Sequence, residues 1–245
     1  MSNSADKKNG KKNGKKEKKR ARDESGARPQ GRRRAKSAPK GRLVALEGAR
    51  GRDLQDATER LSRLLRDGDG DAGWSGWDAS NTFYELRLGK AKKLFAPPKS
   101  LVLLYASDLM FRLRWEIDPA LAEGRTVIAA PYVQTAIAFG MAVGLDKDWL
   151  EELFSFAPAA DVKLRIKEKP KLKDSAKKKA NGKEKRPKSA AGFVDFCCGS
   201  LAASSSEWNS SELRAAVLKG LEAMEERGEL RRFGKKLPKE TAENR

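Results

Sequence analysis

Residues 43–54 read Leu-Val-Ala-Leu-Glu-Gly-Ala-Arg-Gly-Arg-Asp-Leu and predict a short strand, a glycine-containing loop and the start of a helix. The apolar run at 43–46 has the length of a buried strand, and Gly48 and Gly51 mark the loop that follows it. Apolar residues then recur at helical spacing, at Leu54, Ala57, Leu61, Leu64 and Leu65.

The remainder of the body continues this alternation of strands and helices. Helical spacing predicts helices over 99–116, 135–143 and 148–156, and apolar runs predict strands over 126–130 and 161–166. Pro119 and Gly124 are expected to form a turn before the second of the three strands. The pattern predicts an α/β fold with a mostly parallel sheet flanked by helices in three layers.

The C-terminal part predicts a closing helix. Ser210 and Ser211 are good N-cap residues, and Gly228 is a suitable stop. Residues 225–232 also resemble the helix-to-wing junction of winged-helix DNA-binding proteins. We favour a helix packed on the sheet, because no preceding helix-turn-helix pair is visible.

The charge of the chain is concentrated in two segments. The chain has 245 residues and a net charge of +19, of which residues 1–40 carry +12 and residues 167–190 carry +8. We predict a disordered basic tail over 1–40, an α/β domain over 41–234 interrupted by a basic low-complexity insert at 167–190, and a flexible C-terminus over 235–245. Both basic segments could bind nucleic acid or another polyanion, or could act only as solubilising segments.

Composition excludes several classes of protein. No apolar stretch approaches the roughly 20 residues of a membrane helix, and the first 40 residues contain no apolar segment typical of a signal peptide, so we expect a soluble, cytoplasmic protein. Cys197 and Cys198 are adjacent and are the only cysteines, which gives neither a disulfide framework nor a zinc site. The chain has no histidine, so any catalysis must use carboxylates, lysine, arginine, hydroxyls or backbone groups.

The order of these elements resembles the thymidylate kinase family. Residues 101–108 read Leu-Val-Leu-Leu-Tyr-Ala-Ser-Asp, and residues 117–128 read Ile-Asp-Pro-Ala-Leu-Ala-Glu-Gly-Arg-Thr-Val-Ile. In that family a leucine-rich segment leads into Ala-Asp-Arg, and Ile-x-Pro-Ala-Leu-x-x-Gly-x-x-Val-Ile precedes Asp-Arg-Tyr. The resemblance covers roughly residues 42–166. It implies a P-loop fold, transfer of the γ-phosphate of ATP to dTMP with Mg²⁺, and a homodimer.

The phosphate loop of this family, Gly-x-x-x-x-Gly-Lys-Ser/Thr, is degenerate here. Aligned from Gly48, its second glycine becomes Asp53, its lysine becomes Leu54 and its magnesium-binding hydroxyl becomes Gln55. Asp53 is expected instead to act as an N-cap and to interact with the helix dipole. The degenerate loop therefore comprises Gly48, Arg50, Gly51, Arg52, Asp53, Leu54 and Gln55.

Two further family motifs are also altered. The Ala-Asp-Arg motif becomes 106–109 Ala-Ser-Asp-Leu and loses its arginine, while Asp-Arg-Tyr becomes 130–132 Ala-Pro-Tyr and keeps only the tyrosine. Asp108 and Tyr132 are therefore candidate remnants of the nucleotide site. We predict no catalytic residues and no metal site, with ATP and Mg²⁺ as cofactors only if the protein is an active kinase.

Three functions remain open at this level. The first is a catalytically inactive binding or regulatory module with a thymidylate-kinase-like fold. The second is a divergent nucleoside monophosphate kinase that uses Arg50, Arg52 or the basic insert in place of the lost groups. The third is a nucleic-acid-associated protein tethered by its basic segments. Four aromatic residues between the first two predicted helices are expected to pin a long loop to the core, with stacking on bases as the alternative: Trp74, Trp77, Phe83 and Tyr84.

Overall fold

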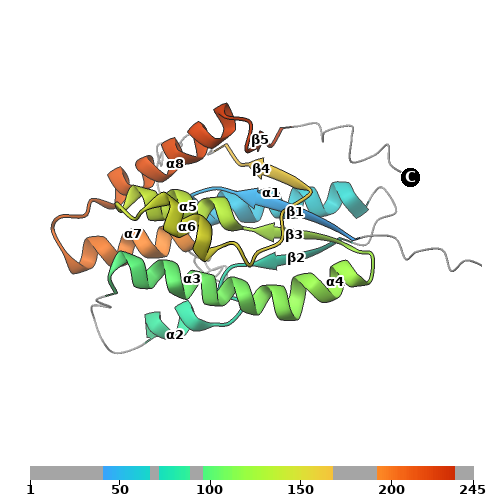
Figure 1. The fold of residues 1–245 in the computed structure, drawn as a ribbon, viewed down its shortest axis with the longest axis horizontal. Coiled ribbons are helices and arrows are strands. Elements are labelled where there is room, and N and C mark those ends of the chain that lie inside the picture. The colour runs from blue at the N-terminus through green and yellow to red at the C-terminus, as the bar shows by residue number, and fades with distance from the viewer. Residues whose placement is uncertain (1–40, 67–71, 89–95, 168–191, 235–245) are drawn as a thin grey trace, which may run out of the picture. The chain divides into compact units, whose positions relative to one another are not determined.

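Parallel strands form one sheet through the centre of the described chain (Figure 1). This computed structural model describes residues 41–66, 72–88, 96–167 and 192–234. The order of strands across the sheet is β2-β3-β1-β4-β5, and every neighbouring pair is parallel. The strands are β1 Arg42–Glu47, β2 Ala72–Gly76, β3 Thr126–Ala130, β4 Val162–Arg165 and β5 Arg231–Arg232. The predicted α/β fold of the P-loop type is confirmed.

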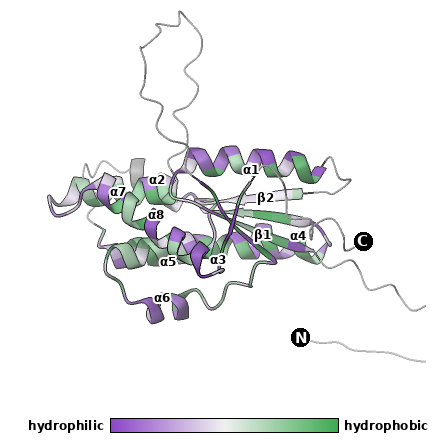
Figure 2. Cartoon of the chain, turned by 90° about the horizontal axis from the view of Figure 1, so that it is seen from above, coloured by the Kyte–Doolittle hydropathy of each residue, from purple (hydrophilic) through white to green (hydrophobic). Residues whose placement is uncertain are grey.

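Helices cover both faces of the sheet. Figure 2 shows α1 on one face, with α3, α5 and α8 on the other. The helices are α1 Gly51–Arg66, α2 Thr82–Leu88, α3 Pro98–Arg112, α4 Asp118–Ala122, α5 Val133–Ala142, α6 Lys147–Leu153, α7 Phe193–Ser204 and α8 Ser210–Glu226, with a π-helical segment η1 at Leu113–Ile117 between α3 and α4. Of the described helices, α1 is thus the one that packs on its face of the sheet.

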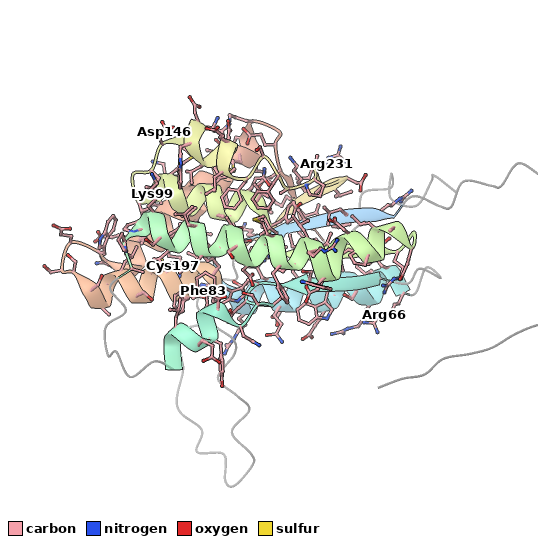
Figure 3. All side chains as sticks on the ribbon, turned by 60° about the horizontal axis from the view of Figure 1, so that its bottom comes forward. Arg66, Phe83, Lys99, Asp146, Cys197 and Arg231 are labelled. Carbon is pink, nitrogen blue, oxygen red and sulfur yellow. The ribbon has the colours of Figure 1, made fainter. Side chains whose placement is uncertain are left out.

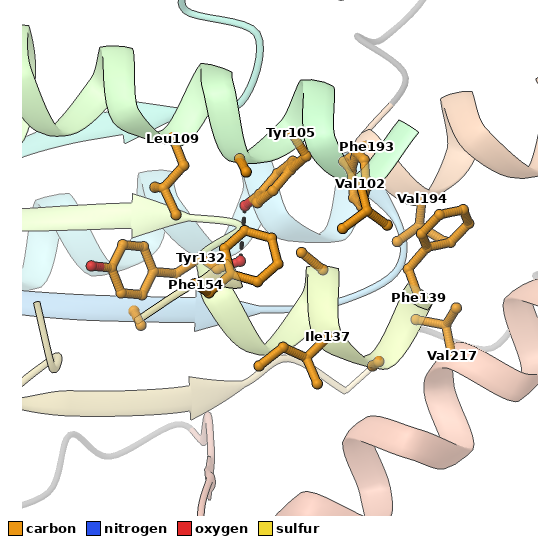
Figure 4. Packing of buried hydrophobic residues seen from close by; sticks show 14 of the residues in the cluster. Val102, Tyr105, Leu109, Tyr132, Ile137, Phe139, Phe154, Phe193, Val194 and Val217 are labelled. Atoms are coloured by element: carbon orange, nitrogen blue, oxygen red, sulfur yellow. Dashed lines mark hydrogen bonds between the residues drawn. The ribbon is translucent and has the colours of Figure 1, made fainter. Parts of the chain in front are cut away.

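The alternation of side chains along β1 divides the core into two parts. Leu43 and Ala45 belong to the larger cluster, which contains buried residues of α3, α5, α7 and α8 (Figure 4). Val44 and Leu46 point to the opposite face and pack with Leu54 and other apolar residues of α1. The larger cluster lies beneath several helices, whereas the smaller cluster lies beneath α1.

The sequence pattern located most elements and missed others. β3 occupies the predicted residues 126–130, and the predicted helix over 99–116 is α3 followed by η1. Residues 118–122 form α4, where the sequence predicted part of a turn. Residues 72–88, which were expected to be a loop, form β2 and α2.

The C-terminal helix is capped differently from the prediction. The N-cap of α8 is Asn209, whose side-chain oxygen accepts hydrogen bonds from the backbone N–H groups of Ser211 (2.9 Å) and Glu212 (3.4 Å). Gly228 has φ +78° and follows the helix, as predicted. β5 pairs in parallel with β4, so the closing helix packs against the sheet and residues 231–232 do not form a wing.

Several sequence predictions concern residues outside the described ranges. The basic tail over 1–40, residues 168–190 of the basic insert and the C-terminus over 235–245 all lie there. Within the described ranges, every helix is too short or too polar to cross a bilayer.

Candidate functional site

The degenerate phosphate loop is short and passes directly into helix α1. β1 ends at Glu47 and α1 begins at Gly51, which leaves residues 48–50 as the connection. The backbone N–H of Leu54 donates to the carbonyl oxygen of Arg50 at 3.0 Å, which is a hydrogen bond of the first helical turn. A phosphate loop instead directs free amides at phosphate oxygens. The backbone amide of Leu54, which occupies the lysine position, instead donates a hydrogen bond within α1.

Leu54 belongs to the core beneath α1. Its side chain is only 4% exposed and packs in the smaller cluster. The Leu54 Cγ and Cδ2 atoms both lie 3.4 Å from the position that a Cβ on Gly48 would take, and the Ile166 Cβ lies at the same distance from that position. The leucine therefore packs against the start of the loop, at the point where the family has a phosphate-binding cation.

A carboxylate of the protein itself binds the start of α1. The backbone N–H of Gly51 donates to Asp195 Oδ2 at 3.0 Å, and Arg214 Nη2 donates to Asp195 Oδ1 at 2.6 Å. Asp195 lies in the first turn of α7, and Arg214 lies in α8. A negative charge at a helix N-terminus is favourable, and this is the charge that a bound phosphate would otherwise supply. Asp195 thus acts as an internal anion at the degenerate loop.

Two glycines bring the backbones of α1 and α7 into close contact. A Cβ on Gly192, the N-cap of α7, would lie 2.6 Å from the Cα and 2.7 Å from the N of Gly51. Any side chain at 192 would therefore overlap the first residue of α1. This close approach explains how the Asp195 carboxylate reaches the Gly51 amide.

The charged residues of the loop interact with one another. Arg50 Nη1 lies 3.8 Å from Asp53 Oδ2, and Asp53 is only 8% exposed. Asp53 lies in the first turn of α1, where its charge suits the helix dipole, but it is not the N-cap, so that part of the prediction is wrong. Arg52 is exposed on the same turn, and the exposed Gln55 donates from Nε2 to Glu59 Oε1 at 3.4 Å.

Glu47 and Thr135 fix the loop to helix α5. The buried Glu47 carboxylate accepts hydrogen bonds from the backbone N–H groups of Tyr132, Gln134 and Thr135 and from the Thr135 hydroxyl, at 2.6–3.3 Å. Thr135 Oγ1 in turn accepts from the N–H of Gly48 at 3.1 Å. Burial raises the pKa of the Glu47 carboxyl above its ordinary value, and the hydrogen bonds oppose that rise. No sequence motif had indicated a role for Thr135.

Asp108 holds a neighbouring loop in place. Its buried carboxylate accepts hydrogen bonds from the backbone N–H of Asp78 (2.8 Å) and from the N–H (3.0 Å) and hydroxyl (2.8 Å) of Ser80. Asp78 Oδ1 accepts from the N–H of Phe83 at 2.7 Å, at the start of α2. Asp108 therefore supports the connection between β2 and α2 through three protein donors.

Tyr132 is also part of the packed interior. It is buried, and its hydroxyl donates to the carbonyl oxygen of Pro158 at 2.8 Å. The Tyr105 hydroxyl lies within hydrogen-bonding distance of the carbonyl oxygens of Tyr132 (2.8 Å, drawn in Figure 4) and Pro131 (3.0 Å). Burial raises the pKa of Tyr132 well above its ordinary value. The two candidate remnants, Asp108 and Tyr132, are thus engaged by protein groups.

Arg112, for which no sequence motif had indicated a role, is the largest fully buried side chain of the described residues. Its Nη1 donates to the carbonyl oxygen of Pro131 at 2.9 Å. Its Nε and Nη2 donate to the hydroxyl and carbonyl oxygens of Ser75 at 2.9 and 2.8 Å. Arg112 thereby joins α3 to β2 and to the end of β3.

The four aromatic residues of 74–84 divide into two pairs. Trp77 and Phe83 pack against each other and against Phe193 and Phe196 of α7, with ring centroids 5.0–6.3 Å apart. Phe83 lies at the start of α2 (Figure 3). This pair pins the segment to the core, as predicted. Trp74 and Tyr84 are exposed, so the prediction is wrong for these two residues.

A cavity of about 660 Å³ lies beside α1. Its lining includes Gly51, Gly192 and Pro131 as well as Arg66 and Trp74. Because Gly51 and Arg66 are the first and last residues of α1, the cavity extends along the length of that helix.

The residues of the loop do not fit ATP and Mg²⁺. The lysine position is an apolar core residue, the magnesium-binding position is an exposed glutamine, and the Gly51 amide binds an internal carboxylate. No group of three or more acidic or cysteine side chains in the described ranges could hold a metal ion.

Comparison with known proteins relates part of the chain to thymidylate kinases. No family model matches it. It is 40% identical over 64 residues to a probable thymidylate kinase of Pyrococcus horikoshii, which covers 26% of this chain and 31% of that protein. Over 83 residues it is 28% identical to a probable thymidylate kinase of Pyrobaculum aerophilum, and this match covers 34% of this chain and 43% of that protein. Over 109 residues it is 29% identical to probable thymidylate kinase 2 of Saccharolobus solfataricus, and this match covers 44% of this chain and 51% of that protein. The matches therefore span between 31% and 51% of these relatives.

The fold gives an independent comparison. The crystal structure of thymidylate kinase from Ehrlichia chaffeensis superposes with a TM-score of 0.50 at 16% sequence identity, over 80% of this chain and 86% of that one. At this level of identity the likeness concerns the fold alone. The partial sequence matches and the shared fold together confirm the resemblance to the thymidylate kinase family, and the chain has a thymidylate-kinase-like α/β fold of the P-loop type.

Proposed function

We propose that this protein is catalytically inactive and acts as a binding or regulatory module built on a thymidylate-kinase-like fold. The observation that carries the proposal is the hydrogen bond from the Gly51 amide to Asp195, because it places an internal anion at the start of α1. A triphosphate would have to displace that carboxylate and would meet its negative charge.

The chemistry of phosphoryl transfer supports the same conclusion. Such transfer depends on cations and oriented donors that stabilise the charge of the transferred group. Here the lysine position is the buried Leu54, and Ala130 and Pro131 replace an acid and an arginine of the family. Arg50, one candidate replacement cation, lies beside Asp53.

A turnover assay tests the proposal directly. The full chain is incubated with ATP, Mg²⁺ and dTMP, and formation of ADP is followed beside the Leu54→Ala variant and an authentic thymidylate kinase. We expect no turnover above the Leu54→Ala background. Turnover above that background would contradict the proposal and favour a divergent nucleoside monophosphate kinase.

Calorimetry separates the remaining alternatives. Titrations with ATP·Mg²⁺ and with dTMP, in salt that screens the basic segments, are expected to show no stoichiometric binding. If ATP binds, its affinity should be weakened by Arg50→Ala and Arg52→Ala only if the protein is a divergent kinase that uses these arginines in place of the lost groups. The basic segments 1–40 and 167–190 can bind a polyanion, and this binding does not require the degenerate phosphate loop.

A further inference from the structure

Strand β2 presents an exposed tryptophan to the cavity beside α1. β2 is the edge strand next to β3, and the smaller core cluster beneath α1 is built from residues of β1, β3 and β4. Alternation along β2 turns Ser75 inward, where it accepts a hydrogen bond from Arg112, and turns Trp74 to the opposite face. Trp74 is 66% exposed and lines the cavity.

Gly76 leaves room for the edge of the Trp74 indole beside the strand. A Cβ on Gly76 would lie 2.7 Å from Trp74 Cζ3, 3.5 Å from Cε3 and 3.7 Å from Cη2. The Cζ3 edge of the six-membered ring therefore faces Gly76, and much of the side chain is accessible. An aromatic ring in this position is a ready surface for stacking a planar group.

Two arginines of α1 line the same cavity. Arg63 and Arg66 are three residues apart, so their side chains are neighbours on the helix surface. Arg63 lies 3.5 Å from Glu59, but both side chains are more than half exposed, and an exposed pair of this kind contributes little stability. Its guanidinium is therefore available to an anion, and arginine suits phosphate oxygens well.

The net charge of the chain indicates which kind of ligand this cavity binds. The net charge is +19, and residues 1–40 join the described chain just before β1. The start of β1 and the end of α1, with Arg66, lie at the same end of the sheet (Figure 1). Residues 167–190 carry +8, and Gly192, which follows them, lines the other end of the cavity. The net positive charge of the chain therefore favours a polyanion as the ligand of the cavity beside α1 and β2, the α1–β2 cavity.

We propose that the α1–β2 cavity binds single-stranded nucleic acid, with a base stacked on Trp74 and phosphates at Arg63 and Arg66. Aromatic residues that stack bases beside a basic groove are the usual means of binding single strands. A duplex keeps its bases paired inside the helix, so it cannot offer a free base face to the indole. The proposed contacts at Trp74, Arg63 and Arg66 lie outside the degenerate phosphate loop, and the proposal does not depend on whether the protein is a kinase.

The test compares two oligonucleotides of equal charge. Fluorescence anisotropy measures binding of the full chain to labelled oligothymidylate of about ten nucleotides and to an abasic strand of the same length. Salt of about 0.3 M weakens the contribution of the basic segments. We expect the thymidylate strand to bind about tenfold more tightly than the abasic strand, because each stacked base adds to affinity.

Variants assign this preference to one residue. Trp74→Ala should abolish the preference for bases, and Arg63→Glu with Arg66→Glu should weaken both strands. Trp115→Ala is the matched control, because Trp115 is 65% exposed but follows α3 on the opposite face of the sheet. It should keep the full preference. Gly76→Ala should reduce the preference by pushing the indole out of its place.

Other outcomes would overturn the proposal. Equal binding of the two strands would leave only the basic segments as polyanion binders, and no binding of either strand would contradict the proposal. A preference that survives in Trp74→Ala would place the stacking site elsewhere. If free dTMP at the same nucleotide concentration displaced the oligonucleotide fully, the ligand of the cavity would be a mononucleotide and not a single strand. A preference for double-stranded DNA would likewise exclude stacking of a free base on Trp74.

Discussion

The backbone N–H of Gly51 donates a hydrogen bond to the carboxylate of Asp195, 144 positions further along the chain, at a distance of 3.0 Å. The same carboxylate receives a hydrogen bond from Arg214 at 2.6 Å. α1, α7 and α8 therefore meet at one charged group, at the N-terminus of α1.

Removal of the Asp195 carboxylate should destabilise the fold. Asp195→Ala deprives the start of α1 of its acceptor and leaves Arg214 without this partner, so we expect a loss of about 1–2 kcal/mol in the free energy of unfolding. Urea denaturation measures the loss. Asp148→Ala, which removes an exposed acid from the first turn of α6, serves as the control and should have a much smaller effect. Equal losses in the two variants would show that Asp195 has no special role.

Restoring the family lysine should harm the protein. Leu54→Lys places an ammonium group among buried apolar residues, and we expect a loss of roughly 2–4 kcal/mol of stability, with no gain of ATP binding. Leu64→Lys is the matched control on the same helix, because Leu64 is 42% exposed. Thermal unfolding and calorimetry with ATP·Mg²⁺ provide the two measurements. Tight ATP binding by Leu54→Lys would mean that the loop can still open around phosphate.

Glu47 should make stability depend on pH. Because burial raises its pKa, the folded state holds the Glu47 proton to higher pH than the unfolded state does. Its stabilising contribution is complete below the ordinary value of 4.5 and is lost as pH rises through the folded-state pKa. The stability of the wild type relative to Glu47→Gln should therefore fall from pH 4.5 upward. Urea titrations across this range measure it, with the exposed Glu207→Gln as a control. A relative stability that rises with pH would contradict the raised pKa.

Arg112 should resist even a conservative change. Lysine cannot reproduce the three hydrogen bonds that the guanidinium makes to Ser75 and Pro131, so Arg112→Lys should cost about 2–3 kcal/mol. Arg114→Lys, on the exposed side of the following turn, should be nearly neutral. Chemical denaturation compares the two. A similar small effect for both would show that Arg112 contributes little through its geometry.

The sequence predicted those parts of the fold that have a local pattern. The apolar run at 43–46, the spacing of Leu54, Ala57 and Leu61, and the alternation at 161–166 each correspond to an observed element. β2 has no such pattern, because Ala-Gly-Trp-Ser-Gly contains no β-branched residue and two glycines. It is a strand because it pairs with β3 along its whole length.

Only those features of the candidate site that lie within a local sequence motif could be predicted. The losses at Asp53, Leu54 and Gln55 are visible as departures from a sequence motif. Asp195 and Thr135 lie far from the loop in sequence, and only the folded chain brings them to Gly51 and Gly48. A contact of this kind has no spacing from which it could be inferred.

The close contact of Gly192 with Gly51 has an evolutionary consequence. Opening the loop to a phosphate requires a lysine at 54, release of Asp195 from the Gly51 amide and separation of two backbones that now touch. Each change alone removes a stabilising contact and restores no chemistry. On the proposed function, a lineage that carries all of these contacts is entrenched, because a return to catalysis would pass through less stable intermediates that selection has no reason to retain.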